Sequence, residues 1–420
     1  MSVLIALGGG IENVPVIQRA KALGHTVLVV DGRLAAPGML TADVPVMASC
    51  YHTEQVLPAL GYALKRSGLE PDGVICAGVD APHVAAAIAS AYRLPGLTPE
   101  AARLSVDKLA QKTALRAAGL PVPQFAELEE GGYLTLSSRN PDKVLKPVDS
   151  RGARGVQLLR FGRSQEFGAA LAAAIKASST GRVMVEEYLP GPQLSTESIV
   201  VDGRVLFTAV ALRNYDRLDE YAPYCIEDGF LEPSPEHTLW EKNDLGWRLA
   251  KGRISDLLEK ACSALGFYQS SAGVVKGDLI ISNGEPVILE LAARLSGGFL
   301  CLAHEWTYGV DFIGAAINMA LGVPFSLQPK PVGYCAQCYI FPKLADIGRR
   351  VMRVPLMHRV VGELPISFAT FAVRPGDVLR PVTDHGARLG QVIATGNTPE
   401  KARARAESAV VVMQKAIVLE

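Results

Sequence analysis

The sequence predicts a mixed α/β and α+β protein, and three observations support this prediction. Short apolar runs alternate with helix-like segments near the N-terminus, strand-like runs dominate the middle, and short strands precede a last helix-like segment. Alternating strands and helices are typical of parallel sheets, whereas clustered strands are typical of α+β regions. We expect an N-terminal doubly wound α/β domain over residues 1–97, a larger middle domain over 98–330, and a C-terminal β-rich domain with a terminal helix over 331–420.

The N-terminal domain is predicted from its apolar runs. Runs with the length and continuous apolar character of strands buried in a parallel sheet lie at residues 3–8, 26–31 and 73–78. Helix-like segments lie between them, at residues 11–23 and about 54–66. Thr53 is a residue type that caps helix N-termini, so we expect it to cap the second helix.

A glycine cluster follows the first predicted strand and is similar to a dinucleotide-binding turn. Gly8, Gly9 and Gly10 precede a helix, and Asp31 ends the next strand. The G-x-G-x-x-G pattern counted from Gly8 requires a third glycine at position 13, where the chain has Asn13. We therefore expect a tight turn here. A dinucleotide-dependent oxidoreductase is the alternative from another functional class.

The middle domain begins with a helix signal and continues with strands. Thr98 suits the N-cap and Pro99 the first helical position, so one long helix is expected up to about Ala118. Strand-like runs follow at residues 143–148, 155–159, 182–189, 195–201 and 204–212. Helices are expected at residues 164–177 and 254–265, and at 399–416 in the C-terminal domain.

Composition excludes several partners. Lys plus Arg and Asp plus Glu both number 42, so the chain has no net charge to attract nucleic acid or an anionic membrane. The N-terminus lacks signal-peptide features, no apolar run is long enough to span a bilayer, and the seven cysteines are sparse. We expect a cytoplasmic protein with reduced thiols. Cys335 and Cys338 lie in a strand-like run, where their spacing places them on opposite faces, which disfavours a metal or redox pair.

A predicted β-hairpin carries two acidic residues. Strand-like runs containing Asp278 and Glu290 flank Asn283-Gly284, a strong turn signal. A two-residue loop would pair Asp278 with Leu289, whereas a three-residue loop would set Asp278 opposite Glu290; we expect the second register. Facing carboxylates repel unless a cation lies between them, and oxygen ligands suit Mg²⁺ or Mn²⁺. The alternative is a solvated hairpin with two scattered acids.

A second candidate site precedes this hairpin. Lys146 lies in a predicted strand, and the polar loop at residues 149–155 contains Gly152 and Gly155. Glycines allow backbone N–H groups to close over phosphate oxygens, and a lysine can reach the same oxygens as a point charge. The loop can also act as a lid that excludes water. Taken alone, the loop is better explained as a plain surface turn, and its place ahead of the acidic hairpin is what favours a phosphate site.

The order of these pieces resembles the ATP-grasp superfamily of carboxylate ligases over nearly the whole chain. The resemblance rests on Val106-Asp107-Lys108-Leu109, the strand Lys146, the Gly-rich loop, VEEYLPG at residues 185–191 and the acidic hairpin. It implies an ATP-grasp fold in which residues 98–330 form a nucleotide-binding domain of two subdomains. It also implies ATP and Mg²⁺, or Mn²⁺, as cofactors.

The resemblance implies a set of nucleotide-binding residues. Lys108 and Lys146 would contact phosphates. The loop at residues 150–155, which contains Ser150, Gly152 and Gly155, would cover the β- and γ-phosphates. Glu186, Glu187 and Leu189 would form the hinge that binds adenine. Gln193 stands where relatives often have a ribose-binding glutamate. Asp278 and Glu290 would hold the metal, and Ala292 stands where many relatives have Asn, so fewer protein ligands are expected.

The implied reaction activates a carboxylate as an acyl phosphate, which an amine then attacks. Arg294 is the expected catalytic residue because a guanidinium fork can grip two oxygens of the acyl phosphate. Ser296, Gly297 and Gly298 would donate backbone hydrogen bonds to the substrate carboxylate. The loop at residues 213–230 is a candidate acceptor wall, and a solvated aromatic loop is an equal alternative; its residues of interest are Tyr215, Asp216, Tyr221, Tyr224 and Glu227. His237 and His304 are expected to be structural.

The substrates are expected to be small molecules, a carboxylate and an amine. The run LSGGFL followed by His304-Glu305 resembles the amino acid ligase branch, which predicts amide or peptide bond formation. Within the same fold, a carboxylase or a purine-pathway ligase using bicarbonate or formate is the nearest alternative. A non-catalytic nucleotide sensor is a further alternative, and a homodimer is left open.

Overall fold

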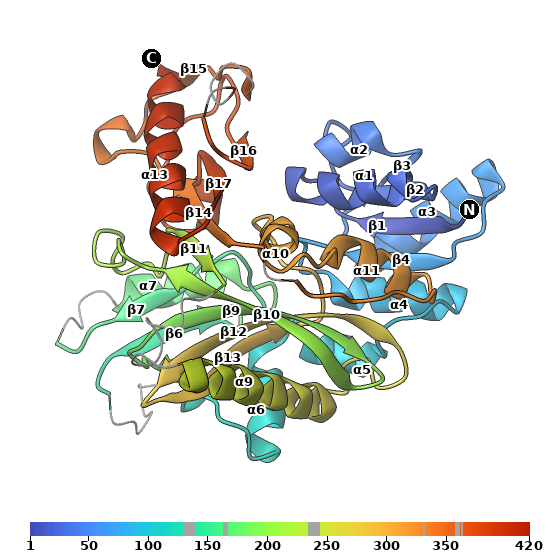
Figure 1. The fold of residues 1–420 in the computed structure, drawn as a ribbon, viewed down its shortest axis with the longest axis horizontal. Helices are drawn as coiled ribbons and strands as arrows, with labels where there is room; N and C mark the ends of the chain where they lie inside the picture. Colours follow the sequence, from blue (N-terminus) through green and yellow to red (C-terminus); the bar gives the residue numbers. More distant parts are fainter. Residues whose placement is uncertain (129–139, 163–166, 234–243, 331, 358–361, 363) are drawn as a thin grey trace.

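The computed structural model describes residues 1–420 except 129–139, 163–166, 234–243, 331, 358–361 and 363, and describes the backbone alone for 244–251. A small N-terminal sheet with its helices, a small antiparallel sheet and a large antiparallel sheet make up the fold, and the C-terminal helix stands beside the end of the large sheet (Figure 1). The predicted mixture of α/β and α+β architecture is confirmed. The predicted His237 lies outside the described residues.

The N-terminal region is a parallel sheet of strand order β3-β2-β1-β4. Its strands are β1 (Val3–Leu7), β2 (Thr26–Asp31), β3 (Val44–Met47) and β4 (Gly73–Cys76). Its helices are α1 (Val14–Ala22), α2 (Pro37–Thr41), α3 (Thr53–Ser67) and α4 (Pro82–Tyr92), and a 3₁₀ turn spans Ile11–Asn13. Every residue of β1 is buried, as expected for a strand covered on both faces.

One helix cap in this region differs from expectation, and the glycine turn forms as expected. Thr53 is the first residue of α3 rather than its cap; the N-cap position is His52, which makes no side-chain hydrogen bond there. The Gly9 N–H donates to Asp31 Oδ2 at 2.8 Å, so this carboxylate satisfies the backbone of the glycine turn. Such a turn needs Gly at position 8, where φ is +89°.

The entry to the middle region is two helices, not one. Thr98 caps α5 (Pro99–Leu104) by accepting from the Ala101 N–H, as predicted. The chain then breaks at residues 105–107, and Asp107 caps α6 (Lys108–Ala117) by accepting from the Ala110 N–H at 2.9 Å. The expected long helix was wrong because an Asp cap outcompetes helix continuation at this position.

The small antiparallel sheet has the order β5-β8-β6-β7. Its strands are β5 (Phe125–Leu128), β6 (Lys143–Pro147), β7 (Gln157–Leu159) and β8 (Val183–Glu187), and α7 (Phe167–Ala177) packs against it. This sheet carries Lys146 and Glu186 on neighbouring strands, because β6 and β8 pair with each other.

The large sheet has the order β13-β12-β9-β10-β11-β14-β17-β16. Its strands in chain order are β9 (Gln193–Val201), β10 (Arg204–Asn214), β11 (Gly229–Glu232), β12 (Ala272–Ser282), β13 (Glu285–Ala292), β14 (Tyr334–Ile340), β16 (Phe368–Phe371) and β17 (Gly390–Gly396). Because β11 pairs with β14, the sheet continues across the expected boundary at residue 331. The three-domain division therefore stays a prediction.

Helices cover both faces of this sheet. α9 (Asp244–Leu265) packs Ile254 and Leu258 onto one face, and α10 (Leu300–Tyr308) with α11 (Phe312–Ala320) lies on the other, next to the N-terminal sheet (Figure 1). α13 (Pro399–Ala416) packs on β14 and β17, and the short strands β15 (Val351–Arg353) and β18 (Val418–Leu419) pair beside it. No helix in the described part of the chain has the length and apolarity needed to cross a bilayer.

The cysteines are free thiols. Cys335 and Cys338 both lie on β14, where Cys335 is buried and Cys338 is partly exposed. Their positions agree with the expected opposite orientation along a strand.

Candidate active site

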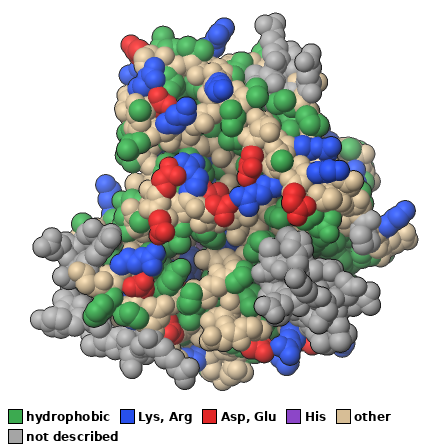
Figure 2. Space-filling view, turned by 60° about the vertical axis from the view of Figure 1, so that its left-hand side comes forward, with side chains coloured by type: hydrophobic (Ala, Val, Ile, Leu, Met, Phe, Trp, Pro, Cys, Tyr) green, Lys and Arg blue, Asp and Glu red, His purple; other side chains and the backbone are tan. Residues whose placement is uncertain are grey.

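A cavity of about 780 Å³ lies where the N-terminal region, both antiparallel sheets and the C-terminal region meet. The predicted residues that line it are Lys108, Lys146, Ser150, Gly152, Glu186, Glu187, Leu189, Gln193, Glu227, Asp278, Glu290, Arg294, Ser296, Gly297 and Gly298. Gly155 lies outside the lining, where a Cβ would meet Ala174 and Ala177 of α7. On the face drawn in Figure 2, acidic and basic side chains are interspersed, so that face offers no patch of one charge to a nucleic acid.

The acidic hairpin has the expected pairing but reaches it differently. Asp278 of β12 pairs with Glu290 of β13, as predicted. The loop contains two residues, Asn283 and Gly284, both with positive φ, and not the expected three. A β-bulge leaves Leu289 between the partners of Asp278 and Leu279, and this extra residue brings Glu290 opposite Asp278.

Basic side chains surround the two carboxylates. Lys108 Nζ lies 3.1 Å from Glu290 Oε1, Arg213 lies 2.9 Å from Asp278 Oδ1, and Lys276 also pairs with Asp278. Burial opposes ionisation of Asp278, but Arg213 and Lys276 hold its pKa below the ordinary value. The Asp278 carboxylate is therefore ionised, as a metal ligand must be.

The donor set at this hairpin fits a divalent ion that is also bound by phosphates. Asp278 Oδ1 is buried and, within the described part of the chain, receives no hydrogen bond of good geometry despite its contact with Arg213. Among the described residues, no group of three or more His, Cys, Asp or Glu is placed to hold a metal. Two carboxylates with phosphate and water ligands are the usual environment of Mg²⁺.

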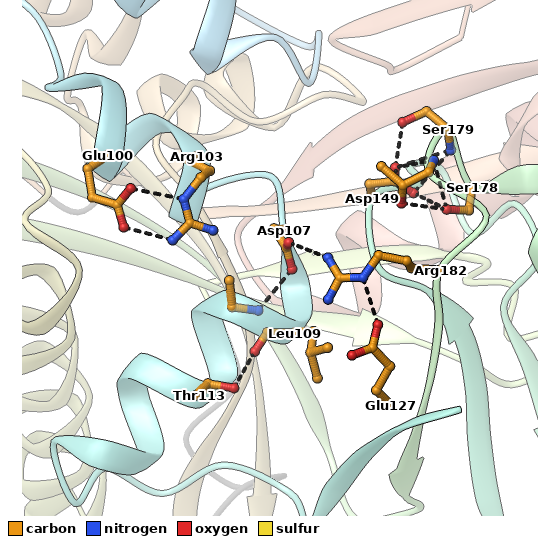
Figure 3. A network of polar contacts seen from close by, with 12 residues as sticks. Glu100, Arg103, Asp107, Leu109, Thr113, Glu127, Asp149, Ser178, Ser179 and Arg182 are labelled. Atoms are coloured by element: carbon orange, nitrogen blue, oxygen red, sulfur yellow. Dashed lines mark hydrogen bonds and ion pairs between the residues drawn. The ribbon is translucent and has the colours of Figure 1, made fainter. Parts of the chain in front are cut away.

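The Gly-rich loop is anchored at its base, as Figure 3 shows. Asp149 accepts hydrogen bonds from Ser178 Oγ at 2.6 Å and from the backbone N–H groups of Ser179 and Thr180. Lys108 holds the same loop, because its N–H donates to Val148 O and its Nζ donates to Ser150 O at 2.6 Å. Lys108 therefore connects the loop to Glu290 of the acidic hairpin.

The loop also contacts both outer regions of the molecule. The Arg151 guanidinium lies 3.7 Å from the centre of the Tyr51 ring in the N-terminal region. The His385 N–H of the C-terminal region donates to Gly152 O at 3.0 Å. These contacts place the loop over the cavity rather than away from it.

Arg294 lies at the cavity with its side chain 12% exposed, and it is held by the N-terminal region. Its guanidinium pairs with Asp80, with Nε 2.6 Å from Asp80 Oδ1, and donates to Leu295 O at 3.0 Å. Burial disfavours the cation, but Asp80 raises the pKa of Arg294 further above its ordinary value. Arg294 is thus a permanent cation in a fixed orientation, and it is not an exposed arginine paired with a surface acid.

The segment after Arg294 is held from several sides. The Ser296 N–H donates to Glu197 Oε1 at 2.6 Å, and Gln337 Nε2 donates to Gly298 O at 2.6 Å. A Cβ at position 297 would come 2.8 Å from Glu12 Oε2, so a larger residue there would displace the end of the Glu12 side chain. The Ser296 N–H is therefore already paired within the protein, which corrects its expected role as a donor to substrate. Its Oγ is buried and has no hydrogen-bond partner among the residues that the structure describes.

The candidate acceptor wall is partly brought to the cavity. Tyr215 and Glu227 line it, and Glu227 pairs with Arg213 and with Arg388 at 2.9 Å. Asp216, Tyr221 and Tyr224 do not line the cavity. Asp216 instead pairs with Arg403 of α13, and the Tyr221 ring packs at a tilt against the Phe341 ring.

Comparisons with known proteins agree with this geometry. A family model described as "ATP-grasp domain" matches residues 105–298, and a model described as "L-amino acid ligase C-terminal domain 2" matches residues 365–411. The chain contains an ATP-grasp domain. The matched segment contains the nucleotide-loop, hinge and acidic-hairpin residues, so the resemblance inferred from the sequence is confirmed.

Individual relatives of this ATP-grasp protein are distant. It is 29% identical to a D-alanine–D-alanine ligase of Desulforudis audaxviator over 46% of the chain and 59% of that protein. It is 24% identical to carnosine synthase 1 of Gallus gallus over 78% of the chain and 36% of that protein. The chain thus spans less than two thirds of these relatives. The L-amino acid ligase from Bacillus licheniformis shares its fold, with a TM-score of 0.78, 19% identity, and coverage of 100% of this chain and 98% of that one.

Several residues that line the ATP-grasp cavity were not expected. Glu12 follows β1 and Asp80 follows β4, at the carboxyl edge of the parallel sheet, which is where such sheets bind ligands. Their position directly after predicted parallel strands was the feature of the sequence that could have identified them as cavity residues. Burial raises the pKa of Glu12, against the lowering effect of a Gly298 backbone hydrogen bond and of Arg388 and Arg294.

His304 is structural, as predicted, and its environment is unusual. It lies between two fully buried carboxylates, with Nε2 2.6 Å from Glu197 Oε2 and Nδ1 2.5 Å from Glu232 Oε1. Burial alone would lower the pKa of His304, but Glu232 and Glu197 raise it to about 10. Both ring nitrogens can donate only in the imidazolium form, so the cation matches this position.

Replacing His304 by Gln is expected to lower the free energy of unfolding by about 3 kcal/mol, because two buried carboxylates lose their cation. Since the pKa rises from 6.5 unfolded to about 10 folded, this stabilisation is complete below about pH 6.5 and is lost as pH rises toward 10. Urea unfolding between about pH 7 and 9 should show a decline of up to about 1.4 kcal/mol per pH unit that H304Q lacks. The exposed His52→Gln is the control; a parallel decline in H304Q would contradict the assignment.

Proposed function

We propose that the protein is an ATP-dependent carboxylate–amine ligase that forms an amide or peptide bond. The observation that carries this proposal is the convergence in one cavity of Lys146, the opposed Asp278 and Glu290, and the largely buried Arg294. This set provides cations for nucleotide phosphates, carboxylates for a divalent ion, and a rigid guanidinium for a developing oxyanion.

The proposed reaction has two steps. An oxygen of the substrate carboxylate attacks the γ-phosphorus of ATP, the bond to the bridging oxygen breaks, and ADP leaves. The amine nitrogen then attacks the acyl carbon, loses a proton, and phosphate leaves with the oxygen that came from the carboxylate. Each step concentrates negative charge on oxygens near the cavity-lining cations, so preorganised positive charge is the main contribution expected of the protein.

The residues of the chain divide this work by position. Lys108 and Lys146 bind phosphate oxygens, the Gly-rich loop excludes water above them, and Glu187, Leu189 and Gln193 border the adenosine end. Asp278 and Glu290 would hold Mg²⁺, which when bound neutralises phosphate charge. Arg294 grips the acyl phosphate and its tetrahedral successor.

Amino acids are the proposed substrates. The match of residues 365–411 to an L-amino acid ligase domain supports this choice, as does the similarity of the chain to a D-alanine–D-alanine ligase and to carnosine synthase 1. A formate-dependent phosphoribosylglycinamide formyltransferase of Nitratidesulfovibrio vulgaris is 23% identical over 97% of this chain and 94% of its own length, which keeps the purine-pathway alternative in the test. Cytoplasmic location and a homodimer stay predictions.

Phosphate release from MgATP tests this function. Purified protein with pairs of amino acids should release ADP and phosphate in proportion to a ligated product identified by mass spectrometry. No release is expected with bicarbonate or formate and an aminated ribonucleotide; turnover with these instead would favour the purine-pathway alternative. MgATP binding without turnover on any pair would favour a sensor, and tight NAD binding without ATP binding would favour an oxidoreductase.

A further inference from the structure

A lysine on the buried face of α6 lies directly behind the nucleotide site. The buried residues of this helix are Lys108, Gln111, Lys112 and Leu115, which recur at the three- and four-residue spacing of one helix face. Lys112 is 1% exposed and does not line the cavity, unlike Lys108. A fully buried ammonium group needs a compensating anion, and Lys112 Nζ lies 3.0 Å from Glu186 Oε1.

Glu186 is shared between two lysines. Lys146 Nζ lies 2.7 Å from the same Oε1 atom, and the Glu186 side chain is 4% exposed. Lys146 and Glu186 line the cavity, so Lys146 approaches the carboxylate from the nucleotide side and Lys112 from the core side. One buried carboxylate therefore has two cations, one more than its charge requires.

The presence of two lysines at one carboxylate has a consequence for nucleotide binding. This inference rests on the use of ATP proposed above. Lys146 must direct its charge at phosphate oxygens when the nucleotide binds, and it then interacts less with Glu186. Without another cation, this would leave a buried carboxylate uncompensated, which is strongly unfavourable. We propose that Lys112 is the core-side counter-ion of Glu186 that allows Lys146 to exchange this carboxylate for nucleotide phosphates. Lys112 is thus a positioning residue, since it does not touch the nucleotide.

The electrostatics of the cluster agree with this exchange. Burial and the neighbouring Lys146 lower the pKa of Lys112 to about 8, while Glu186 and, more weakly, Glu290 act to raise it. Burial opposes ionisation of Glu186, but both lysines hold its pKa below the ordinary value. The two lysines repel each other across one carboxylate, and phosphate binding by Lys146 relieves that repulsion.

Replacing Lys112 by Met tests the proposal through binding, without the acid and amine substrates. Calorimetry should show MgATP affinity lowered by about 10- to 100-fold, because Lys146 is retained by Glu186. Adenosine, which has no phosphates, should bind within about two-fold of wild type. Lys415→Met, an exposed lysine of α13, is the matched control. Equal losses for adenosine and MgATP, or an unchanged MgATP affinity, would overturn the proposal.

Neutralising the carboxylate together with the lysine separates this role from a purely structural one. The double variant K112M/E186Q should fold, as judged by its thermal unfolding, and should bind MgATP within about three-fold of E186Q alone. This comparison tests the counter-ion role even if the single variant K112M does not fold. A double variant that is unfolded, or that binds MgATP about ten-fold more weakly than E186Q, contradicts the counter-ion role. Wild-type protein that binds no MgATP would instead refute the proposed function.

Discussion

Replacing Glu290 by Gln is expected to lower turnover by about 10³-fold while leaving the fold intact. The change keeps the size of the side chain and removes the charge that would hold a divalent ion opposite Asp278. Glu290 is 30% exposed, so its ion pair with Lys108 contributes little to folding compared with its proposed role in catalysis. Steady-state ADP release and thermal unfolding, measured on the same preparation, check both parts of the prediction.

The same strand offers a matched control. Glu285→Gln makes the identical chemical change at the start of β13, where the side chain is 65% exposed and pairs with Arg253. This variant should turn over at the wild-type rate. If E290Q kept more than about a tenth of wild-type turnover, the assignment of this residue to the metal would be wrong.

Replacing Arg294 by Lys is expected to lower kcat by about 10²- to 10³-fold with little change in MgATP affinity. Lysine keeps the charge but cannot grip two oxygens with a planar fork, and its ammonium cannot reproduce both the Asp80 and Leu295 contacts of the guanidinium. Because Arg294 is proposed to act on the acyl phosphate, the loss should appear in turnover rather than in nucleotide binding.

Calorimetric MgATP titration beside steady-state kinetics distinguishes this effect from a general loss of structure. Arg253→Lys, at an arginine that is 57% exposed, is the control and should leave both quantities unchanged. A variant R294K that loses MgATP affinity as much as turnover would show that Arg294 serves the nucleotide or the domain contact with Asp80 instead.

Local motifs allowed much of the site to be predicted. Asp278 and Glu290 lie on one hairpin, so their proximity follows from a turn signal and the two-residue period of strands. The local geometry that pairs them was not predicted. A three-residue loop was expected, whereas a two-residue turn together with a bulge at Leu289 produces the same pairing. A bulge adds one unpaired residue to one strand, so counting residues from the turn does not reveal it.

Long-range contacts explain what the sequence did not reveal. Glu12, Asp80 and Arg388 reach the cavity from regions far apart in the chain, and no local pattern relates them. The role of Lys112 could not be predicted for a related reason. Its position on α6 predicts that it is buried, but its partner Glu186 lies on β8, far along the chain, and no local pattern relates the two. The break of the expected long helix is instead a local effect. Asp107 caps a second helix, and the residue pattern alone does not show whether an Asp lies within a helix or begins a new one.

The fate of the carboxylate oxygens tests the central claim most directly. A ligatable acid labelled with ¹⁸O in its carboxylate, incubated with MgATP, the amine and the enzyme, should transfer one labelled oxygen to each phosphate released, together with ADP. Unlabelled phosphate, or label recovered in AMP, would contradict activation through an acyl phosphate.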